Sequence, residues 1–173
     1  KTTLLKPQTD SQRFFSTFWR SMKTGMNYRK AKSTDFEKLK SLGIESYSEF
    51  SDVLSESNWA KMNSFLESEE NLKSLMSQST VFVCEKEAEL IGMIYLVPRG
   101  NPSELFHESW SYIRFLGVHS RQRGVGVGKK LTDLCIAHAQ ATKEKFIALH
   151  TSEFMDAARA IYEKKGFTKT KEI

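Results

Sequence analysis

The sequence lacks the features that indicate a membrane-spanning helix, a disulfide-bonded protein or a metal site. It has no apolar run approaching the roughly eighteen residues of a membrane-spanning helix, so we expect no membrane span. It has two cysteines, Cys84 and Cys135, and both lie in apolar segments, so we expect them to be buried and reduced in a cytoplasmic protein. His107 and His119 have no partner at the spacing of metal ligands, so we predict no metal site.

Charge of one sign is not concentrated anywhere along the chain. The 26 Lys and Arg residues against 21 Asp and Glu residues leave a formal net charge of +5, which favours anionic partners in general. No basic run is long enough to indicate nucleic-acid binding, and that alternative would rest on Arg121, Arg123, Lys129 and Lys130. At 173 residues the chain has the size of one domain.

What the sequence does contain is a regular order of helical and strand patterns. Apolar residues either alternate with polar ones or recur at helical spacing. In chain order these patterns predict a strand at 27–32, helices beginning near 34 and 58, strands at 80–85, 90–97 and 110–118, a helix through 131–138, a strand at 146–151, a helix at 155–165 and the start of a strand at 167. This order predicts a mixed α/β domain with parallel pairing only across the helical crossovers.

The most informative stretch joins the strand at 110–118 to the helix that follows it. It holds three glycines among cationic residues, namely Gly124, Gly126 and Gly128. A helix N-terminus presents free backbone N–H groups and the positive end of the helix dipole, and glycines let an anion approach that backbone closely. The pattern therefore predicts a phosphate-binding turn.

The spacing of these glycines narrows the kind of phosphate site. A Walker A loop has a longer gap between its glycines and then Lys followed by Ser or Thr, whereas Lys130 occupies the hydroxyl position here. The dinucleotide fingerprint G-x-G-x-x-G is also missed, because the third glycine comes too early. What fits is Arg123-x-x-Gly126-x-Gly128, preceded by Leu116-Gly117-Val118.

This motif resembles the coenzyme-binding motif of the GNAT superfamily of acetyl-CoA-dependent N-acetyltransferases. A second segment agrees, because Tyr162-Glu163-Lys164-Lys165-Gly166-Phe167 resembles the closing helix of that family and its Tyr-x-x-x-Gly-Phe ending. The resemblance covers residues 27–167 and implies the GNAT fold, a mixed central β-sheet with splayed parallel central strands, here 110–118 and 146–151, flanked by helices. It also implies acetyl-CoA as the cosubstrate and transfer of its acetyl group to a primary amine.

The resemblance further implies which residues form the site. Backbone groups of the strand end, at Leu116, Gly117 and Val118, would bind the pantetheine arm, and the turn after it would bind the pyrophosphate. The residues of that turn are Arg123, Gly124, Val125, Gly126, Val127 and Gly128, with Lys129 as an added cation. Tyr162 would face the cofactor sulfur and protonate the leaving thiolate, with an ordinary core aromatic as the alternative.

Neither the general base nor the acceptor is fixed by the sequence. Tyr112 occupies the strand position at which some family members carry a glutamate. His150 or Glu153 would have to act through a water, and each would equally serve as an ordinary polar residue. Arg114, in phase with Tyr112 on the strand, would indicate an acceptor with a carboxylate if it faces the cleft. A small-molecule amine and a protein N-terminus both stay open as acceptors.

The sequence also leaves a non-catalytic alternative open and predicts different roles for its first and last segments. Absence of the strand glutamate keeps open a non-catalytic acyl-CoA-binding or regulatory module. Residues 1–25 are expected to be an extension or leader, with a transit peptide or a docked helix as the alternatives, and residues 26–173 to be the N-acetyltransferase domain. The family continues with further strands after the Gly-Phe ending, so we expect these to be missing or supplied from elsewhere, for example by a neighbouring subunit in a homodimer.

Overall fold

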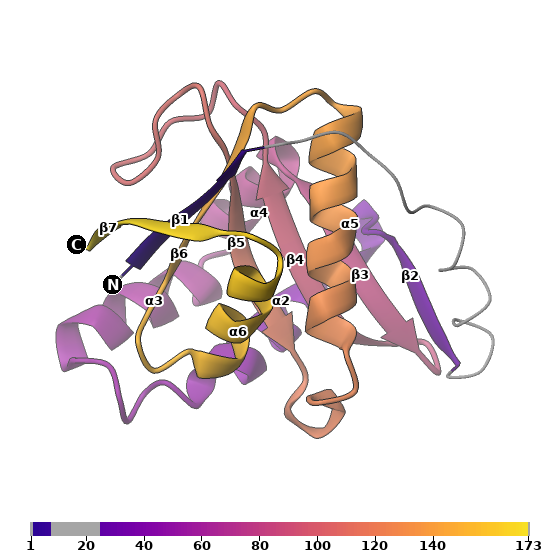
Figure 1. Cartoon of the computed structure of the whole chain (residues 1–173). Coiled ribbons are helices and arrows are strands. Elements are labelled where there is room, and N and C mark those ends of the chain that lie inside the picture. The colour runs from indigo at the N-terminus through magenta and orange to yellow at the C-terminus, as the bar shows by residue number, and fades with distance from the viewer. Residues whose placement is uncertain (1, 8–24, 173) are drawn as a thin grey trace.

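The computed structural model describes residues 2–7 and 25–172, which fold around one mixed β-sheet (Figure 1). Its seven strands lie in the order β2-β3-β4-β5-β6-β1-β7. They are β1 (Thr2–Pro7), β2 (Met26–Lys30), β3 (Thr80–Lys86), β4 (Glu89–Val97), β5 (Ser111–Val118), β6 (Phe146–Thr151) and β7 (Thr168–Glu172). The helices are α2 (Phe36–Ser48), α3 (Glu56–Glu67), α4 (Glu69–Gln78), α5 (Val127–Ala141) and α6 (Asp156–Lys164), with short 3-10 turns η1 (Ser33–Asp35) and η2 (Ser120–Gln122). The predicted α/β architecture is confirmed.

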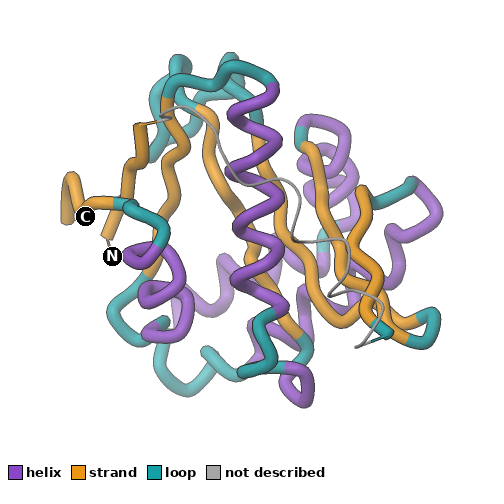
Figure 2. The backbone as a smooth tube through the Cα atoms, turned by 45° about the vertical axis from the view of Figure 1, so that its right-hand side comes forward, coloured by secondary structure: helices purple, strands orange, loops and turns teal. Residues whose placement is uncertain are grey.

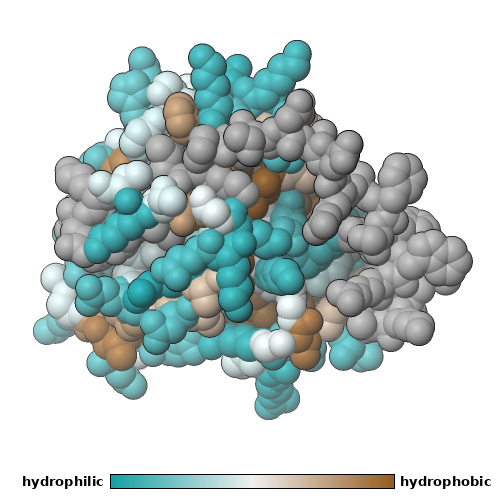
Figure 3. Space-filling view, in the orientation of Figure 1, coloured by the Kyte–Doolittle hydropathy of each residue, from teal (hydrophilic) through white to brown (hydrophobic). Residues whose placement is uncertain are grey.

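Helices cover both faces of the sheet, which gives the molecule three layers (Figures 1 and 2). On β3, Phe82 and Cys84 pack with residues of α5 and α6, whereas Val81 and Val83 pack with residues of α2 and α4. Because both faces are buried, β3 and β4 are continuous apolar runs rather than alternating ones. The outer surface of the α5 and α6 layer is mainly hydrophilic where it is described (Figure 3).

Several sequence-based expectations concern single residues or segments of this fold. Cys84 and Cys135 are both buried and both free thiols. No helix within the described ranges has the length and apolar character that a bilayer span requires. The predicted hairpin is confirmed, and β3 and β4 join through Glu87 and Ala88, whose φ angles of 53° and 66° match the positive φ of a type I′ turn.

The central feature is the divergence of β5 from β6. The two strands pair in parallel only where Ser111–Ile113 lies beside Ile147–Leu149. Beyond that point β5 contains a bulge, because Phe115 and Leu116 together face the single residue Ile94 of β4, and Phe115 has a φ of 48°. A bulge bends its strand and increases the local twist. The bend turns the end of β5 away from β6, so the predicted splaying of the central strands is confirmed.

On its other side β6 is paired with the first strand of the chain. β1 runs antiparallel to β6, with Thr2 opposite Thr151 and Pro7 opposite Phe146. β7 then pairs antiparallel with β1 at the edge of the sheet. The position beside β6 is thus occupied by residues 2–7 of the same chain. The rest of the segment expected to be an extension or leader, residues 8–24, lies outside the described residues.

Candidate functional site

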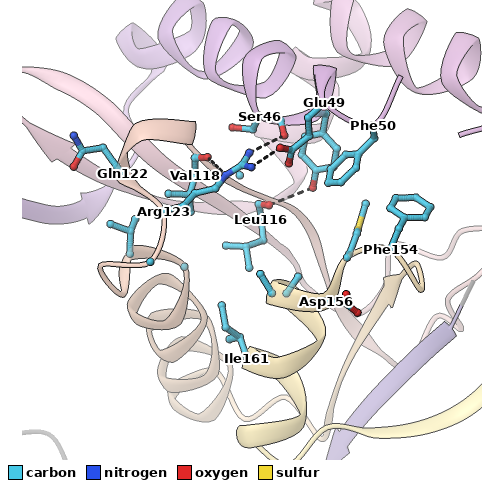
Figure 4. A pocket seen from close by; sticks show the side chains of 18 residues that line it. Ser46, Glu49, Phe50, Leu116, Val118, Gln122, Arg123, Phe154, Asp156 and Ile161 are labelled. Carbon is cyan, nitrogen blue, oxygen red and sulfur yellow. Dashed lines mark hydrogen bonds and ion pairs between the residues drawn. The ribbon is translucent and has the colours of Figure 1, made fainter. Parts of the chain in front are cut away.

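The divergence of β5 and β6 opens two adjoining cavities. The smaller, of about 230 Å³, lies between α2, the end of β5, the turn before α5 and the start of α6 (Figure 4). The larger, of about 680 Å³, lies between β5 and β6 and is covered by α3. Both are lined by Tyr47, Leu116, Phe154, Met155 and Ala158, so they meet at the gap between the strand end and α6. A ligand threaded through this gap would have one end in each cavity.

The glycine-rich turn borders the smaller cavity with unpaired backbone donors. Gly124 and Gly126 adopt positive φ values of 78° and 94°, and Gly126 caps α5 without a side-chain hydrogen bond. The first bond that α5 forms back to its cap is from the Lys130 N–H to the Gly126 carbonyl, at 3.0 Å. In the described ranges, no acceptor is bonded to the N–H groups of residues 124–129. Free donors at the positive end of a helix favour a bound anion such as a phosphate.

Close packing between glycines and their neighbours brings these backbones together. A Cβ on Gly128 would lie 3.3 Å from Ile161 of α6, and one on Gly117 would lie 3.0 Å from Ser46 of α2. The larger side chain of any other residue would push these helices apart. Gly117 and Gly128 therefore act through their small size, which allows α2 and α6 to form the cavity walls.

The side chain of Arg123 lies on the α2 side of the smaller cavity. Its guanidinium donates to Glu49 Oε2 at 2.5 Å, to the Ser46 carbonyl at 3.4 Å and to the Val118 carbonyl at 3.1 Å (Figure 4). These bonds tie α2 to the end of β5. Arg123 was expected to add a cation beside the pyrophosphate; in the described structure each of its nitrogens donates to one of these acceptors, and the residue lines the smaller cavity.

The structure brings together most of the residues predicted to bind a coenzyme. Those that line the smaller cavity are Leu116, Gly117, Val118, Arg123, Gly124, Val127 and Gly128. Three others, Val125, Gly126 and Lys129, do not line it. The side chains of Val125 and Lys129 are exposed, so any contribution from the turn's outer residues would come from their backbone N–H groups.

Tyr162 lies in α6 and lines the larger cavity. Its side chain is only 5% exposed, and its ring packs edge-on against Phe167 at 5.7 Å. Burial raises the pKa of the Tyr162 hydroxyl above its usual value. No described residue forms a hydrogen bond with this hydroxyl. The Tyr162 hydroxyl therefore stays protonated at neutral pH and lines the cavity without a bond to another described residue.

The two residues considered as general bases are placed differently. His150 of β6 lines the larger cavity, whereas Glu153 is exposed and lines neither cavity. Tyr112, at the position where a glutamate was sought, is buried and stacks on Phe106 with ring centroids 4.3 Å apart. A stacked, buried tyrosine fills that position with apolar surface, and in the described chain no carboxylate takes its place. His150 is thus the better placed of the two candidates.

Sequence reasoning missed the residues that cover the larger cavity. These come from α2 and α3 and include Tyr47, Asn58, Met62 and Phe65. Their sequence shows only the apolar spacing of an amphipathic helix, which cannot indicate that one helix covers a cavity rather than a closed core. No group of three or more His, Cys, Asp or Glu side chains in the described part of the chain is arranged to hold a metal ion.

Comparisons with known proteins agree on the kind of site. The model of the acetyltransferase (GNAT) family matches residues 45–167. N-acetyltransferase family 8 member 3 of Rattus norvegicus is 29% identical over 95 residues, which are 55% of this chain and 41% of that protein. The 5-NmdU N-acetyltransferase of Pseudomonas phage PaMx11 is 28% identical over 88 residues, 51% of this chain and 56% of that protein. The chain thus spans about half the length of these relatives.

A solved structure resembles the fold over most of its length. The PaiA N-acetyltransferase from Thermoplasma acidophilum, solved in complex with coenzyme A, superposes with a TM-score of 0.68 at 18% identity. The match covers 83% of this chain and 89% of that one. At this identity the likeness concerns the fold.

Proposed function

The chain belongs to the GNAT family of acetyltransferases, and from that premise we propose that it transfers the acetyl group of acetyl-CoA to a primary amine. The observation that carries the proposal is the row of unpaired N–H groups over residues 124–129, which borders a cavity that opens between diverging strands. These donors fit the pyrophosphate of coenzyme A. We assign the N-acetyltransferase domain to residues 26–173, with β1 (Thr2–Pro7) completing its sheet.

The pantetheine arm would run along the end of β5 toward the gap shared by the two cavities. Leu116, Gly117 and Val118 line this path and would offer backbone groups to its amides. The Leu116 carbonyl accepts a long, 3.4 Å bond from the Tyr47 hydroxyl, and the Val118 carbonyl accepts from Arg123. The thioester would then lie at the gap, with the acceptor amine entering from the larger cavity.

The reaction would proceed by direct attack without a covalent enzyme intermediate. The neutral amine nitrogen attacks the thioester carbonyl carbon, and a C–N bond forms. Backbone N–H groups at the end of β5 would stabilise the negative charge of the tetrahedral intermediate, and the N–H of Val118 is the candidate donor. The C–S bond then breaks, the Tyr162 hydroxyl gives its proton to the thiolate, and the nitrogen loses its extra proton to a base or to water. His150 would accept that proton through a water.

The proposal is tested by two measurements on the same protein. Acetyl-CoA is expected to raise the melting temperature, because a ligand that binds only the folded state stabilises it. Release of free coenzyme A thiol is expected only when an amine is added, across a panel of amino acids, polyamines, aminoglycosides and peptides with a free N-terminus. Acetyl-CoA binding without thiol release for any amine would contradict the proposed activity.

A non-catalytic acyl-CoA-binding module is the second candidate, and one specific observation favours it. The strand position that holds a glutamate in some family members is filled here by the buried Tyr112. The nucleic-acid alternative has less support, because Arg123, one of its four cations, is paired with Glu49. Binding of DNA or RNA that acetyl-CoA fails to compete would support that alternative. A homodimer stays a prediction.

A further inference from the structure

Arg114 projects from β5 into the larger cavity, in which the proposed acceptor would bind. Its guanidinium lies over the ring of Phe65 from α3, with its central carbon 4.9 Å from the ring centroid, and over the ring of Phe115 at 5.2 Å. The guanidinium thus packs on two neighbouring rings, whose centroids are 5.5 Å apart, and such contact with aromatic rings favours arginine over lysine. Its N–H donors at the guanidinium edge remain without any hydrogen bond or ion pair to a described residue.

This absence of a partner sets Arg114 apart from the other described arginines. Arg29, Arg99, Arg123 and Arg159 each form an ion pair with a carboxylate. Arg121 is exposed to water. Arg114 is half-buried, and burial lowers the pKa of its guanidinium. A cation that loses water without gaining an acid costs free energy, so such groups are normally paired.

The cavity itself does not supply the missing acid. Glu104 contributes the one carboxylate among its described lining residues; it is exposed and forms no ion pair with Arg114. Most of the lining is apolar, with Met62, Phe65 and Phe115 among its residues. The cavity therefore combines an apolar wall with one unpaired, oriented cation, which is what a ligand with a carboxylate and an apolar part would require.

We propose that the acceptor is an amine that also bears a carboxylate, as a free amino acid does, and that Arg114 binds that carboxylate. The inference rests on the proposed acetyltransferase function and names its substrate class. The carboxylate of such a molecule would lie at Arg114, and its amine would lie at the gap near Tyr162, which lines the same cavity. A protein N-terminus lacks this feature, because its nearest carboxyl group is an amide.

The test compares matched pairs of acceptors. Each of several amino acids with apolar side chains is assayed against its own amide, phenylalanine and phenylalaninamide being one pair, with thiol release giving kcat/KM for both. For at least one pair the wild-type protein is expected to prefer the carboxylate form by roughly tenfold to a hundredfold, the range of a charge-assisted hydrogen-bonded pair. Arg114→Met should remove this preference, so that the ratio of kcat/KM for the amino acid to that for its amide falls to about one.

Two controls keep the result interpretable. Arg121→Met removes an exposed arginine outside both cavities and should leave the preference unchanged. Arg114→Lys should keep part of it. The ratio of kcat/KM for the amino acid to that for its amide, measured on the wild-type protein, is decisive even if a variant at position 114 fails to fold. The inference would be overturned if amides were acetylated as fast as amino acids in every pair, or if only amines without a carboxylate were acetylated. Absence of turnover with any amine would instead contradict the proposed acetyltransferase.

Discussion

Gly92 of β4 lies directly against Val127, the first residue of α5, and a Cβ on Gly92 would come within 2.6 Å of Val127 Cγ1. The contact fixes how close the start of α5 comes to the sheet, and so where the unpaired N–H groups lie relative to β5. Val127 is only 1% exposed and has no room to yield.

Gly92→Ala is therefore expected to lower the free energy of unfolding by about 1–3 kcal/mol, since overpacking in a dense core forces side chains or backbone to shift. It should also weaken acetyl-CoA binding, because the shift moves the turn. Urea unfolding and a melting-shift titration measure the two effects. Gly43→Ala is the matched control, because its nearest contact is the looser 3.3 Å to Leu66. Equal losses in both variants would contradict the special role of the Gly92 contact.

Gly126→Ala should weaken acetyl-CoA binding by at least about tenfold. The φ of 94° at position 126 strains any residue with a Cβ by about 1–2 kcal/mol, and relief of that strain would rotate the donor N–H groups. Isothermal titration with acetyl-CoA measures the affinity. Gly100→Ala is matched in backbone: its φ is 88°, and, as at Gly126, a Cβ added there would have no atom within 4 Å. It should lose similar stability and keep wild-type affinity; weakened binding in this control would show that the effect is general.

Tyr162→Phe should lower kcat by roughly a hundredfold or more with little change in acetyl-CoA affinity, because general acids contribute about that factor. Burial raises the pKa of Tyr162, so its hydroxyl stays protonated through the usual tyrosine range. Loss of this proton should therefore cause no decline in wild-type kcat as the pH rises to about 10, where an ordinary tyrosine would be half ionised. Steady-state kinetics across pH checks both. Tyr95→Phe, at a buried tyrosine that lines neither cavity, should leave kcat unchanged.

Asp35→Asn should destabilise the fold by about 2 kcal/mol at pH 7, because the Asp35 carboxylate accepts bonds from Arg29 at 2.6 and 2.9 Å and from the Lys32 N–H at 2.7 Å. The hydrogen bond from Arg29 is the main reason that the pKa of Asp35 is lowered. A lowered folded-state pKa means that this stability is present above about pH 4, the unfolded value, and is lost as the pH falls through the folded value.

The measurement is urea unfolding of Asp35→Asn and wild type at pH 7 and at about pH 3. The difference between them should be largest at pH 7 and shrink in acid. Glu89→Gln is the control, because the Glu89 side chain is 76% exposed and its only ion pair, with Lys38, is 3.9 Å long. A pH-independent difference for Asp35→Asn would mean that its charge is not what matters.

The elements that the sequence predicted well are those that depend on local patterns of residues. The strand over 146–151 and the turn of Gly124, Gly126 and Gly128 depend on residues within a few positions of each other, so periodicity and spacing were enough to find them. The proposed acid, Tyr162, came instead from the family resemblance, whose second motif includes Gly166 and Phe167. The predicted splaying of the central strands came from the resemblance, and the structure supplies its physical cause in the bulge at Phe115.

What was missed depends on contacts between distant segments. The engagement of Arg123 by Glu49 joins residues 74 positions apart, and nothing near Arg123 indicates that its charge is used in this way. The closeness of Gly92 to Val127 is likewise invisible in either local segment. The cover of the larger cavity by α3 and the place of β1 beside β6 are tertiary outcomes, which propensity alone does not determine.

The sheet order has a mechanical consequence. Within the described residues β7 pairs only with β1, and β1 in turn with β6, so a force that pulls on β1 would break its hydrogen bonds to β6. Its departure would free the last strand as well and expose the bare edge of β6 to pairing with other chains. β1 and β7 thus fail together, and the wall of the larger cavity formed by β6 is the first part of the interior to lose its lateral support.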